Sequence, residues 1–291
     1  MKKWFLLLSL AAAFFHVDAQ FSFDSAILIQ HVKTLSSDAM EGRKTGTEGG
    51  KKARAYIIDE LKKIGVAPFV PNYSQPFTVK PAGVAGNNIL AVIPGKLAET
   101  IIISAHYDHL GIRNNIIFNG ADDNASGVAA LLSLAQYFTK HPPHHRLIFA
   151  FFDAEEMGLQ GSSFFVNTVN LEGEKTILNI NLDMVSRSDK NELYACGGYH
   201  AADVQKRIEQ VKPPDGFVLR FGHDNPALGH NDWTSQSDHF SFHQKKIPFV
   251  YFGVEDHPDY HRATDDFEKI NRLTFSKSVE TILSCINMLD Q

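Results

Sequence analysis

Cysteine is scarce in this sequence, and neither sign of charge is in strong excess. Cys196 and Cys285 are the two cysteines among 291 residues, far too few for a disulfide-based scaffold. A single bridge between them stays open, because the sequence does not give the distance between their Cα atoms. The formal net charge of -5 offers no strongly basic surface, so no nucleic-acid partner is predicted.

Long apolar runs are absent except near the N-terminus. There, an apolar stretch over residues 4–15 follows two lysines and precedes the small residue Ala19. This layout predicts a secretory signal peptide over residues 1–19, because the stretch is shorter than the roughly 20 residues that span a membrane. We therefore expect a secreted or periplasmic protein that begins near Gln20 and has no stable membrane association after cleavage. A membrane anchor that is retained is the alternative.

The sequence also lacks internal repeats, low-complexity segments and long linkers, which predicts a single domain over residues 20–291. Hydrophobic residues make up 44% of the chain and charged residues 21%, a composition typical of a globular protein. Apolar runs rich in β-branched residues alternate with amphipathic helical patterns. The predicted strands include residues 87–95, 99–105, 146–153, 176–185 and 245–254, and the predicted helices include 50–66, 126–139 and 275–289. This alternation predicts an α/β fold with a mostly parallel central sheet flanked by helices on both faces.

Potential metal ligands follow several of the predicted strands. In an open α/β sheet, ligands bind beyond the carboxyl ends of the strands, so these positions are candidates for chemistry. They hold histidines and acids at residues 106–109, at Asp153, Glu155, Glu156 and Asp183, and at His257 and His261, while Asp122 and Asp123 precede a predicted helix. Two histidines and three carboxylates form a mixed ligand set that suits Zn²⁺, and a shared carboxylate allows two ions in one site. Two Zn²⁺ balance three carboxylates and one hydroxide, whereas one ion would leave excess negative charge.

The motifs, in their order and spacing, resemble those of the M28 zinc peptidases, a family of dizinc aminopeptidases and related exopeptidases. The resemblance runs from EGRKTGTEG through AHYDH, GADDNASG, FFDAEEMGLQGS, NLDMV and SDHFSF to DYHRATDD. It therefore covers nearly all of the chain that follows the predicted signal peptide. The resemblance implies the zinc exopeptidase fold, which agrees with the α/β sheet predicted from the alternation of strands and helices.

Carried over position by position, the resemblance implies two zinc ions that share one carboxylate. His106 and Asp183 would bind one ion, and Glu156 and His261 would bind the other. Asp123, the acid that precedes Asn-Ala-Ser-Gly, would bridge the two ions. The peptide bond that follows Asp123 is expected to be cis.

The same resemblance implies the catalytic groups. Glu155 would act as general base that takes a proton from a water bridging the zinc ions, and the hydroxyl of Tyr260 would stabilise the oxyanion. Asp108, two residues after His106, would orient the imidazole of that ligand. Asp153 has no implied role and is interpreted as structural.

Several histidines keep more than one interpretation. His257 competes with His261 as the second histidine ligand, and the Tyr-His-x-x-x-Asp context favours His261. His109, His239 and His243 are interpreted as structural or as close to the substrate. Residues 213–237 form a long irregular stretch near the expected site, and stretches of this length often have a function.

The implied activity is that of a metal-dependent exopeptidase, namely an aminopeptidase that removes N-terminal residues from peptides with a free N-terminus. Asp238 is a candidate to bind the substrate ammonium, although an ordinary helix cap is the simpler interpretation. The alternatives are a glutaminyl cyclase with a single zinc, a carboxypeptidase, and a receptor-like ectodomain without catalysis. Loss of catalysis would leave ligands or the base missing, and all five ligands and Glu155 are present.

Overall fold

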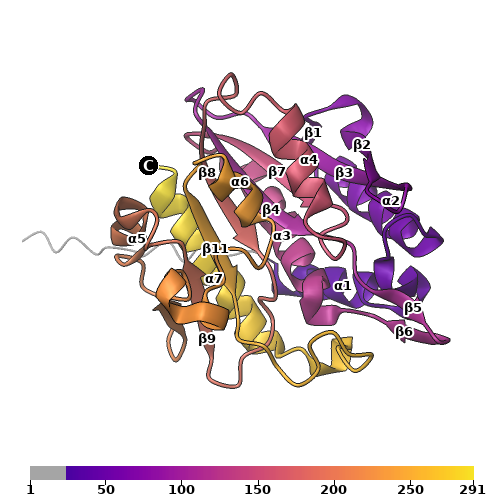
Figure 1. Cartoon of the computed structure of the whole chain (residues 1–291). Coiled ribbons are helices and arrows are strands. Elements are labelled where there is room, and N and C mark those ends of the chain that lie inside the picture. Colours follow the sequence, from indigo (N-terminus) through magenta and orange to yellow (C-terminus); the bar gives the residue numbers. More distant parts are fainter. Residues whose placement is uncertain (1–23) are drawn as a thin grey trace, which may run out of the picture.

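A computed structural model of the protein describes residues 24–291, so the predicted signal peptide over residues 1–19 and the expected start near Gln20 lie outside the described residues. The fold centres on a nine-stranded sheet with helices on both faces (Figure 1). The strands are β1 Ala67–Pro68, β2 Ser74–Val79, β3 Val84–Ile93, β4 Thr100–His106, β5 Gly111–Arg113, β6 Ile116–Phe118, β7 Arg146–Phe152, β8 Thr176–Leu182, β9 Glu192–Cys196, β10 Val218–Phe221 and β11 Phe249–Gly253. The helices are α1 Ser25–Leu35, α2 Glu48–Lys63, α3 Gly127–Lys140, α4 Gln160–Thr168, α5 Ala202–Ile208, α6 His239–Gln244 and α7 Arg272–Leu289.

The large sheet is mixed in its strand directions. Its order is β1-β3-β7-β4-β8-β11-β9-β10, with β2 paired to β3, and β5 and β6 form a separate hairpin. The central strands β7, β4, β8 and β11 are parallel, as the sequence predicts. On the two sides of this group, β3 and β9 pair antiparallel with β7 and β11, while the edge strand β10 pairs parallel with β9. The hairpin of β2 and β3 adds a further antiparallel pair, because strands joined by a tight turn run antiparallel.

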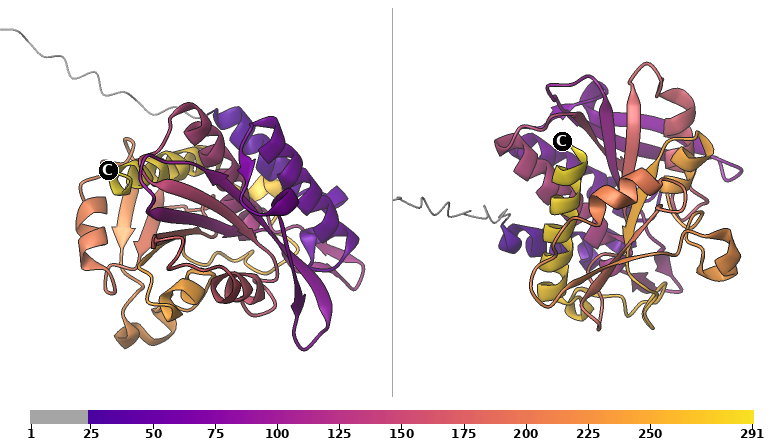
Figure 2. Two further views of the ribbon diagram at one scale, coloured as in Figure 1. Left: turned by 90° about the horizontal axis from the view of Figure 1, so that it is seen from above. Right: turned by 90° about the vertical axis from the view of Figure 1, so that its left-hand side faces the viewer.

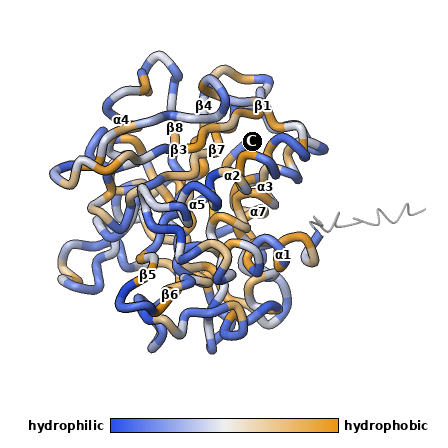
Figure 3. Tube along the Cα trace, turned by 90° about the vertical axis from the view of Figure 1, so that its right-hand side faces the viewer, coloured by the Kyte–Doolittle hydropathy of each residue, from blue (hydrophilic) through white to orange (hydrophobic). Residues whose placement is uncertain are grey.

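Helices cover both faces of the sheet. Helices α1, α2, α3 and α7 lie on one face, while α4 and α6 lie on the other (Figure 2). Alternate residues of β4 lie on opposite faces of the sheet. Ile101 and Ile103 pack in the cluster with α3. Ile102 packs on the other face with Phe165 of α4 and Phe242 of α6. Each fully buried isoleucine contributes roughly 1.5–3 kcal/mol to stability. Figure 3 shows that hydrophobic residues concentrate on the inner strands and α3.

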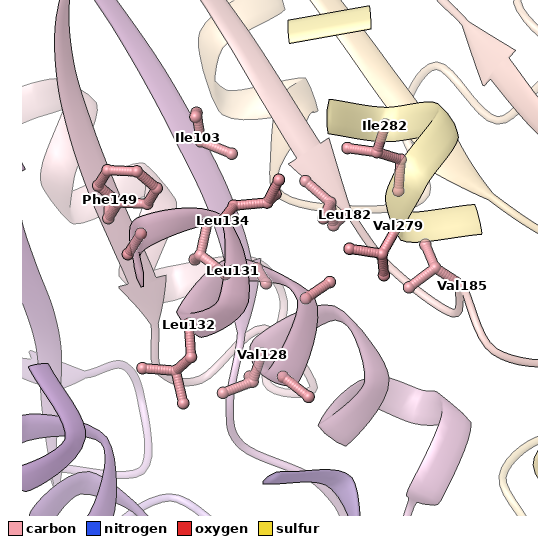
Figure 4. Packing of buried hydrophobic residues seen from close by; sticks show 14 of the residues in the cluster. Ile103, Val128, Leu131, Leu132, Leu134, Phe149, Leu182, Val185, Val279 and Ile282 are labelled. Carbon is pink, nitrogen blue, oxygen red and sulfur yellow. The ribbon is translucent and has the colours of Figure 1, made fainter. Parts of the chain in front are cut away.

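Helix α3 packs directly behind the ends of the central strands. Figure 4 shows Leu134 of α3 beside Ile103 of β4, with Val279 of α7 near Leu182 of β8. A Cβ atom on Gly127, the first residue of α3, would lie 2.6 Å from the carbonyl oxygen of Leu182. Only glycine therefore allows the helix to begin this close to β8, and the segment before the helix is brought to the carboxyl edge of the sheet.

Both cysteines are buried and free, so Cys196 and Cys285 are not bridged. A buried free cysteine behaves as a small apolar side chain. Among residues 24–291, no helix has the length and apolar character that crossing a membrane requires.

Candidate functional site

The predicted metal ligands meet at the carboxyl edge of the parallel strands. His106 is the last residue of β4, Glu156 follows β7 and Asp183 follows β8. Asp123 lies just before α3, and His261 lies in the loop after β11. Neighbouring parallel strands end at the same edge of a sheet, which is why residues from distant parts of the chain come together here.

The first group of potential ligands consists of His106, Asp123 and Asp183, all of them buried. Nε2 of His106 lies 3.2 Å from Oδ1 of Asp183 and 3.5 Å from Oδ1 of Asp123. One ligand atom of each residue lies within 4.8 Å of the other two. These are the residues that the sequence assigns to one zinc ion and to the bridge.

The second group brings together Asp123, Glu156, His261 and His109. Nε2 of His261 lies 3.1 Å from Oδ2 of Asp123 and 3.3 Å from Oε2 of Glu156. Nδ1 of His109 lies 2.7 Å from Oε1 of Glu156 and 3.7 Å from Oδ2 of Asp123. His109 is thus a candidate ligand that sequence reasoning left aside. The motif AHYDH contains His109, three residues after His106, so the sequence did offer it as a further histidine at this strand end.

Asp123 faces both groups at once. Its Oδ1 is turned to His106 and its Oδ2 to His261, which is the arrangement that a bridging carboxylate requires. The peptide bond between Asp123 and Asn124 is cis, as predicted.

Two side chains fix the segment that carries Asp123. Nδ2 of Asn124 donates to the carbonyl of Leu182 at 2.9 Å, and its Oδ1 accepts the N–H of Met184 at 3.2 Å. The carboxylate of Asp265 accepts the N–H of Asp123 at 3.1 Å. The segment is therefore held against the end of β8.

The two histidines after β11 have different acidic partners. Nε2 of His257 lies 3.2 Å from Oδ2 of Asp122. The other oxygen of Asp122 accepts hydrogen bonds from the N–H and the hydroxyl of Ser186. Asp122 and His257 therefore pair with each other outside both ligand groups, and His261 is the histidine that reaches them.

Asp108 has a different side-chain partner from the expected one. Its Oδ1 lies 3.7 Å from Nδ1 of His106, beyond hydrogen-bond distance, and the backbone carbonyl of Asp108 contacts that nitrogen at 3.1 Å. The carboxylate instead accepts the backbone N–H groups of Glu155 at 3.0 Å and Glu156 at 3.3 Å. Asp108 thus contacts the imidazole through its backbone and holds the two glutamates through its side chain. The difference lies in a side-chain rotamer, which residue spacing does not determine.

Asp153 has structural contacts, in line with its interpretation from the sequence. Its carboxylate accepts hydrogen bonds from the N–H groups of Asn87 at 2.8 Å and Ala154 at 2.9 Å, and from the hydroxyl of Thr45 at 2.8 Å. Burial, together with the charge of Asp108, raises the pKa of Asp153 to about 6.

The electrostatics of the two groups favour bound cations. The nearby carboxylates of Asp123 and Glu156 raise the pKa of His261 to about 10. Burial acts to lower the pKa of His106, but Asp183 and other carboxylates outweigh it and hold that pKa well above its ordinary value. The carboxylates therefore stabilise positive charge at the positions where metal ligands are expected.

Several buried atoms of the site also lack a hydrogen-bond partner among the residues that the structure describes. These are both ring nitrogens of His109, Oδ2 of Asp123 and Oε1 of Glu156. Buried polar atoms without partners are unfavourable, and a divalent cation would satisfy them as ligands. With two carboxylates and at least one histidine nitrogen in each group, the donor set fits Zn²⁺.

Glu155 lines the pocket that also contains the expected ligands, but it belongs to neither ligand group. Burial raises the pKa of Glu155 well above its ordinary value, with His106 opposing the rise and Asp183 and Asp238 adding to it. Cations bound nearby would oppose the rise and leave a carboxylate that can accept a proton. Asp238 is fully buried and stands at the N-cap position of α6, but its side chain makes no capping hydrogen bond.

A pocket opens over both ligand groups. Besides the ligands and Glu155, it is lined by Met184, Trp233, Gln236, Tyr251, Val254, Asp256 and Tyr260. The ring of Tyr260 stacks on that of His261, with 4.0 Å between the ring centroids. Trp233 stacks on His223 at 3.8 Å, and it belongs to the long stretch that the sequence placed near the site. Sequence reasoning named the stretch but not the tryptophan.

Comparison with known families decides the classification. A family model described as peptidase family M28 matches residues 88–286. The chain belongs to this family. The resemblance recognised in the motifs is therefore confirmed, and the chain is a zinc metallopeptidase.

The relatives of this M28 chain carry several activities in their names. Aminopeptidase YwaD of Bacillus subtilis is 28% identical over 200 residues, which cover 66% of the chain and 41% of the relative. A Zn-dependent exopeptidase from Parabacteroides distasonis has a TM-score of 0.74 at 20% identity and covers 92% of this chain and 99% of that chain. A glutaminyl cyclase from Bacteroides thetaiotaomicron, bound to N-acetylhistamine, has a TM-score of 0.73 at 21% identity and covers 91% and 98%.

These comparisons differ in what they establish. The chain spans about half the length of the curated relatives it matches, between 41% and 55% for three of them. The two solved structures match nearly end to end, and at their low identity they show the zinc exopeptidase fold rather than a substrate.

Proposed function

We propose that this M28 peptidase is an aminopeptidase that binds the free ammonium group of its substrate. The observation that carries the proposal is the charge of the pocket. Five carboxylates line it, and no lysine or arginine stands among its described lining residues. Three of the five are expected zinc ligands and Glu155 is the expected general base, which leaves Asp256 free to attract a cationic group. A carboxypeptidase would need a basic side chain for the substrate carboxylate.

A neighbouring pocket bears on the carboxypeptidase alternative. It shares Asp256 with the first pocket and contains Arg187 and Lys190. Arg187 pairs with Asp259 at 2.8 Å, and Lys190 lies 3.5 Å from Glu192. Both cations therefore already have acidic partners, which disfavours a strong site for a substrate carboxylate.

The catalytic roles are those that the family resemblance implies, and the positions of the residues in the pocket support them. Zinc ions, when held by the two ligand groups, would polarise the scissile carbonyl and lower the pKa of water. We assign Glu155 to take a proton from the oxygen of the attacking water and to deliver it to the nitrogen of the departing amine. The hydroxyl of Tyr260, beside His261, would donate a hydrogen bond to the oxygen of the carbonyl as negative charge develops there.

Two zinc ions per chain are part of this proposal. The division of the ligands into two groups, with one oxygen of Asp123 facing each, supports two ions rather than one. Zinc analysis of the purified protein distinguishes two ions from the single ion expected of a glutaminyl cyclase. Export from the cytoplasm is also proposed, on the N-terminal sequence alone.

A substrate comparison tests the proposed function. The purified zinc-loaded protein is assayed with leucyl and phenylalanyl amides, with their N-acetylated forms, with a carboxypeptidase substrate blocked at its N-terminus, and with a peptide that begins with glutamine. We expect hydrolysis of the free amines to exceed that of the acetylated forms by about tenfold or more, because a charge-assisted hydrogen bond contributes roughly 1.5–3 kcal/mol. Equal rates for acetylated and free substrates, or conversion of the glutamine peptide to a cyclic product, would contradict the proposal.

A further inference from the structure

Arg43 is a fully buried cation whose five N–H groups all have acceptors. It ends the short helical segment Asp38–Arg43 and has no solvent exposure. Every acceptor is a backbone carbonyl: Nε donates to Tyr107 at 2.9 Å, Nη1 to Leu35 at 2.8 Å and Asn119 at 2.6 Å, and Nη2 to Gly120 at 2.9 Å and Asp123 at 3.4 Å. A guanidinium has five N–H donors in a fixed plane, so this set uses its full capacity.

Four of the five acceptors belong to the two segments that carry metal ligands. Tyr107 follows His106 directly. Asn119 and Gly120 lead into the segment of Asp123, and Asp123 itself is the last acceptor. One planar group therefore fixes the distance between the end of β4 and the segment that bridges the two ligand groups.

The charge of Arg43 does not explain its place in the structure. It makes no ion pair within the described chain, because its donors are used on neutral carbonyls. Burial lowers the pKa of Arg43 to about 10, although Asp123, Asp265 and Asp108 act against this shift. The group therefore remains charged at neutral pH, and its positive charge opposes the binding of cations nearby. A role in metal binding must come from geometry rather than from attraction.

The backbone around Arg43 is shaped for this contact. Glu41, Gly42 and Arg43 all have left-handed conformations, with φ of 51°, 65° and 51°. A Cβ atom on Gly42 would lie 2.4 Å from the carbonyl oxygen of Phe118. The sequence Glu-Gly-Arg is thus folded tightly against the chain just before Asn119, where the guanidinium enters.

We propose that Arg43 is a positioning residue for the metal site. By holding the carbonyls of Tyr107, Asn119, Gly120 and Asp123, it sets the spacing that lets Asp123 face both ligand groups. The proposal rests on the ligand groups and not on the aminopeptidase assignment, so it can be tested without a peptide substrate.

The variant Arg43→Lys tests the inference because it keeps the charge but has three donors in place of five. Arg207→Lys is the matched control, since Arg207 also donates to backbone carbonyls, those of Met288 and Gln291, on the other side of the molecule. We expect Arg43→Lys to weaken zinc binding about tenfold or more in competition with a chelator. It should also shift the visible absorption bands of the Co²⁺-substituted protein, while Arg207→Lys changes neither. Wild-type zinc affinity and an unchanged Co²⁺ spectrum in Arg43→Lys would overturn the proposal.

A second measurement applies if Arg43→Lys does not fold. In the wild-type protein labelled with ¹⁵N, the Nε–H resonance of Arg43 is followed while Zn²⁺ is added, with Arg207 as internal reference. We expect the Arg43 resonance to exchange slowly with water in the metal-free protein and to shift when zinc binds. Rapid exchange in the metal-free protein, or a resonance that does not respond to zinc, would overturn the proposal.

Discussion

Nδ1 of His109 lies 2.7 Å from Oε1 of Glu156, and neither atom has a hydrogen bond within the described chain. The two atoms are close, but their orientation is not that of a hydrogen bond. Both residues belong to the second ligand group, where a bound cation would contact them. His109 therefore competes with His261 as the nitrogen donor to the second ion, or adds to it.

Replacement of His109 should weaken one metal-binding step and spare the other. We expect His109→Gln to lower zinc affinity by about ten- to hundredfold in one step, because His106 and Asp183 of the first group are untouched. Calorimetric titration of the metal-free protein measures both steps. His230→Gln, a change of an exposed histidine, is the control. Two unchanged steps in His109→Gln would restore the structural interpretation of this residue.

Substitutions of the two adjacent glutamates should have different effects, one on turnover and the other on zinc content. Glu155→Gln removes the group that accepts a proton, so we expect turnover to fall by about 10²–10⁴-fold with zinc content as in the wild type. Glu156→Gln removes a ligand oxygen and should lower zinc content. Zinc analysis and steady-state kinetics on both variants check the division of roles. An active Glu155→Gln variant would exclude Glu155 as the general base.

Asp256 at the rim of the pocket should contribute modestly to substrate binding. An exposed ion pair contributes at most about 1 kcal/mol, so we expect Asp256→Asn to raise KM up to about fivefold for substrates with a free amine. The rate constant kcat should change little, and acetylated substrates should not respond. Asp189→Asn, in the neighbouring pocket, is the matched control. An equal effect on free and acetylated substrates would show that Asp256 does not bind the ammonium group.

Zinc binding should release protons at neutral pH. Asp123 and Glu156 raise the pKa of His261 to about 10, so at pH 7 the metal-free imidazole carries a proton that must leave before its nitrogen binds zinc. Zinc affinity should therefore rise with pH up to about 10 and then level off. Calorimetry in two buffers of different ionisation enthalpy counts the protons, and His261→Gln should release about one fewer. Equal counts for the variant and the wild type would contradict the expected protonation.

The sequence predicted most of the fold because its central strands are apolar on both faces and end in polar residues. The antiparallel sides were not predicted, since β1 has two residues and β9 shows no sign of the direction in which it pairs. Sequence periodicity identifies a strand but does not identify its neighbour.

The candidate site was predicted in its residues more completely than in its contacts. The five expected ligands come together, and the cis bond after Asp123 is present. His109 was not assigned as a ligand from the sequence although it lies beside Glu156, and the carboxylate of Asp108 also contacts the backbone of both glutamates. Arg43 could not be found from spacing at all, since its partners are backbone carbonyls that any sequence supplies.

The loop that carries His261 has no covalent link to the strands that it approaches, because both cysteines are free. An ion held jointly by Asp123 and His261 would cross-link two distant parts of the chain in place of a disulfide. Such a cross-link is reversible, and ions that bind only the folded state add about 4 kcal/mol of stability at a thousand times their Kd. The thermal resistance of this enzyme would then rise and fall with the zinc concentration around it.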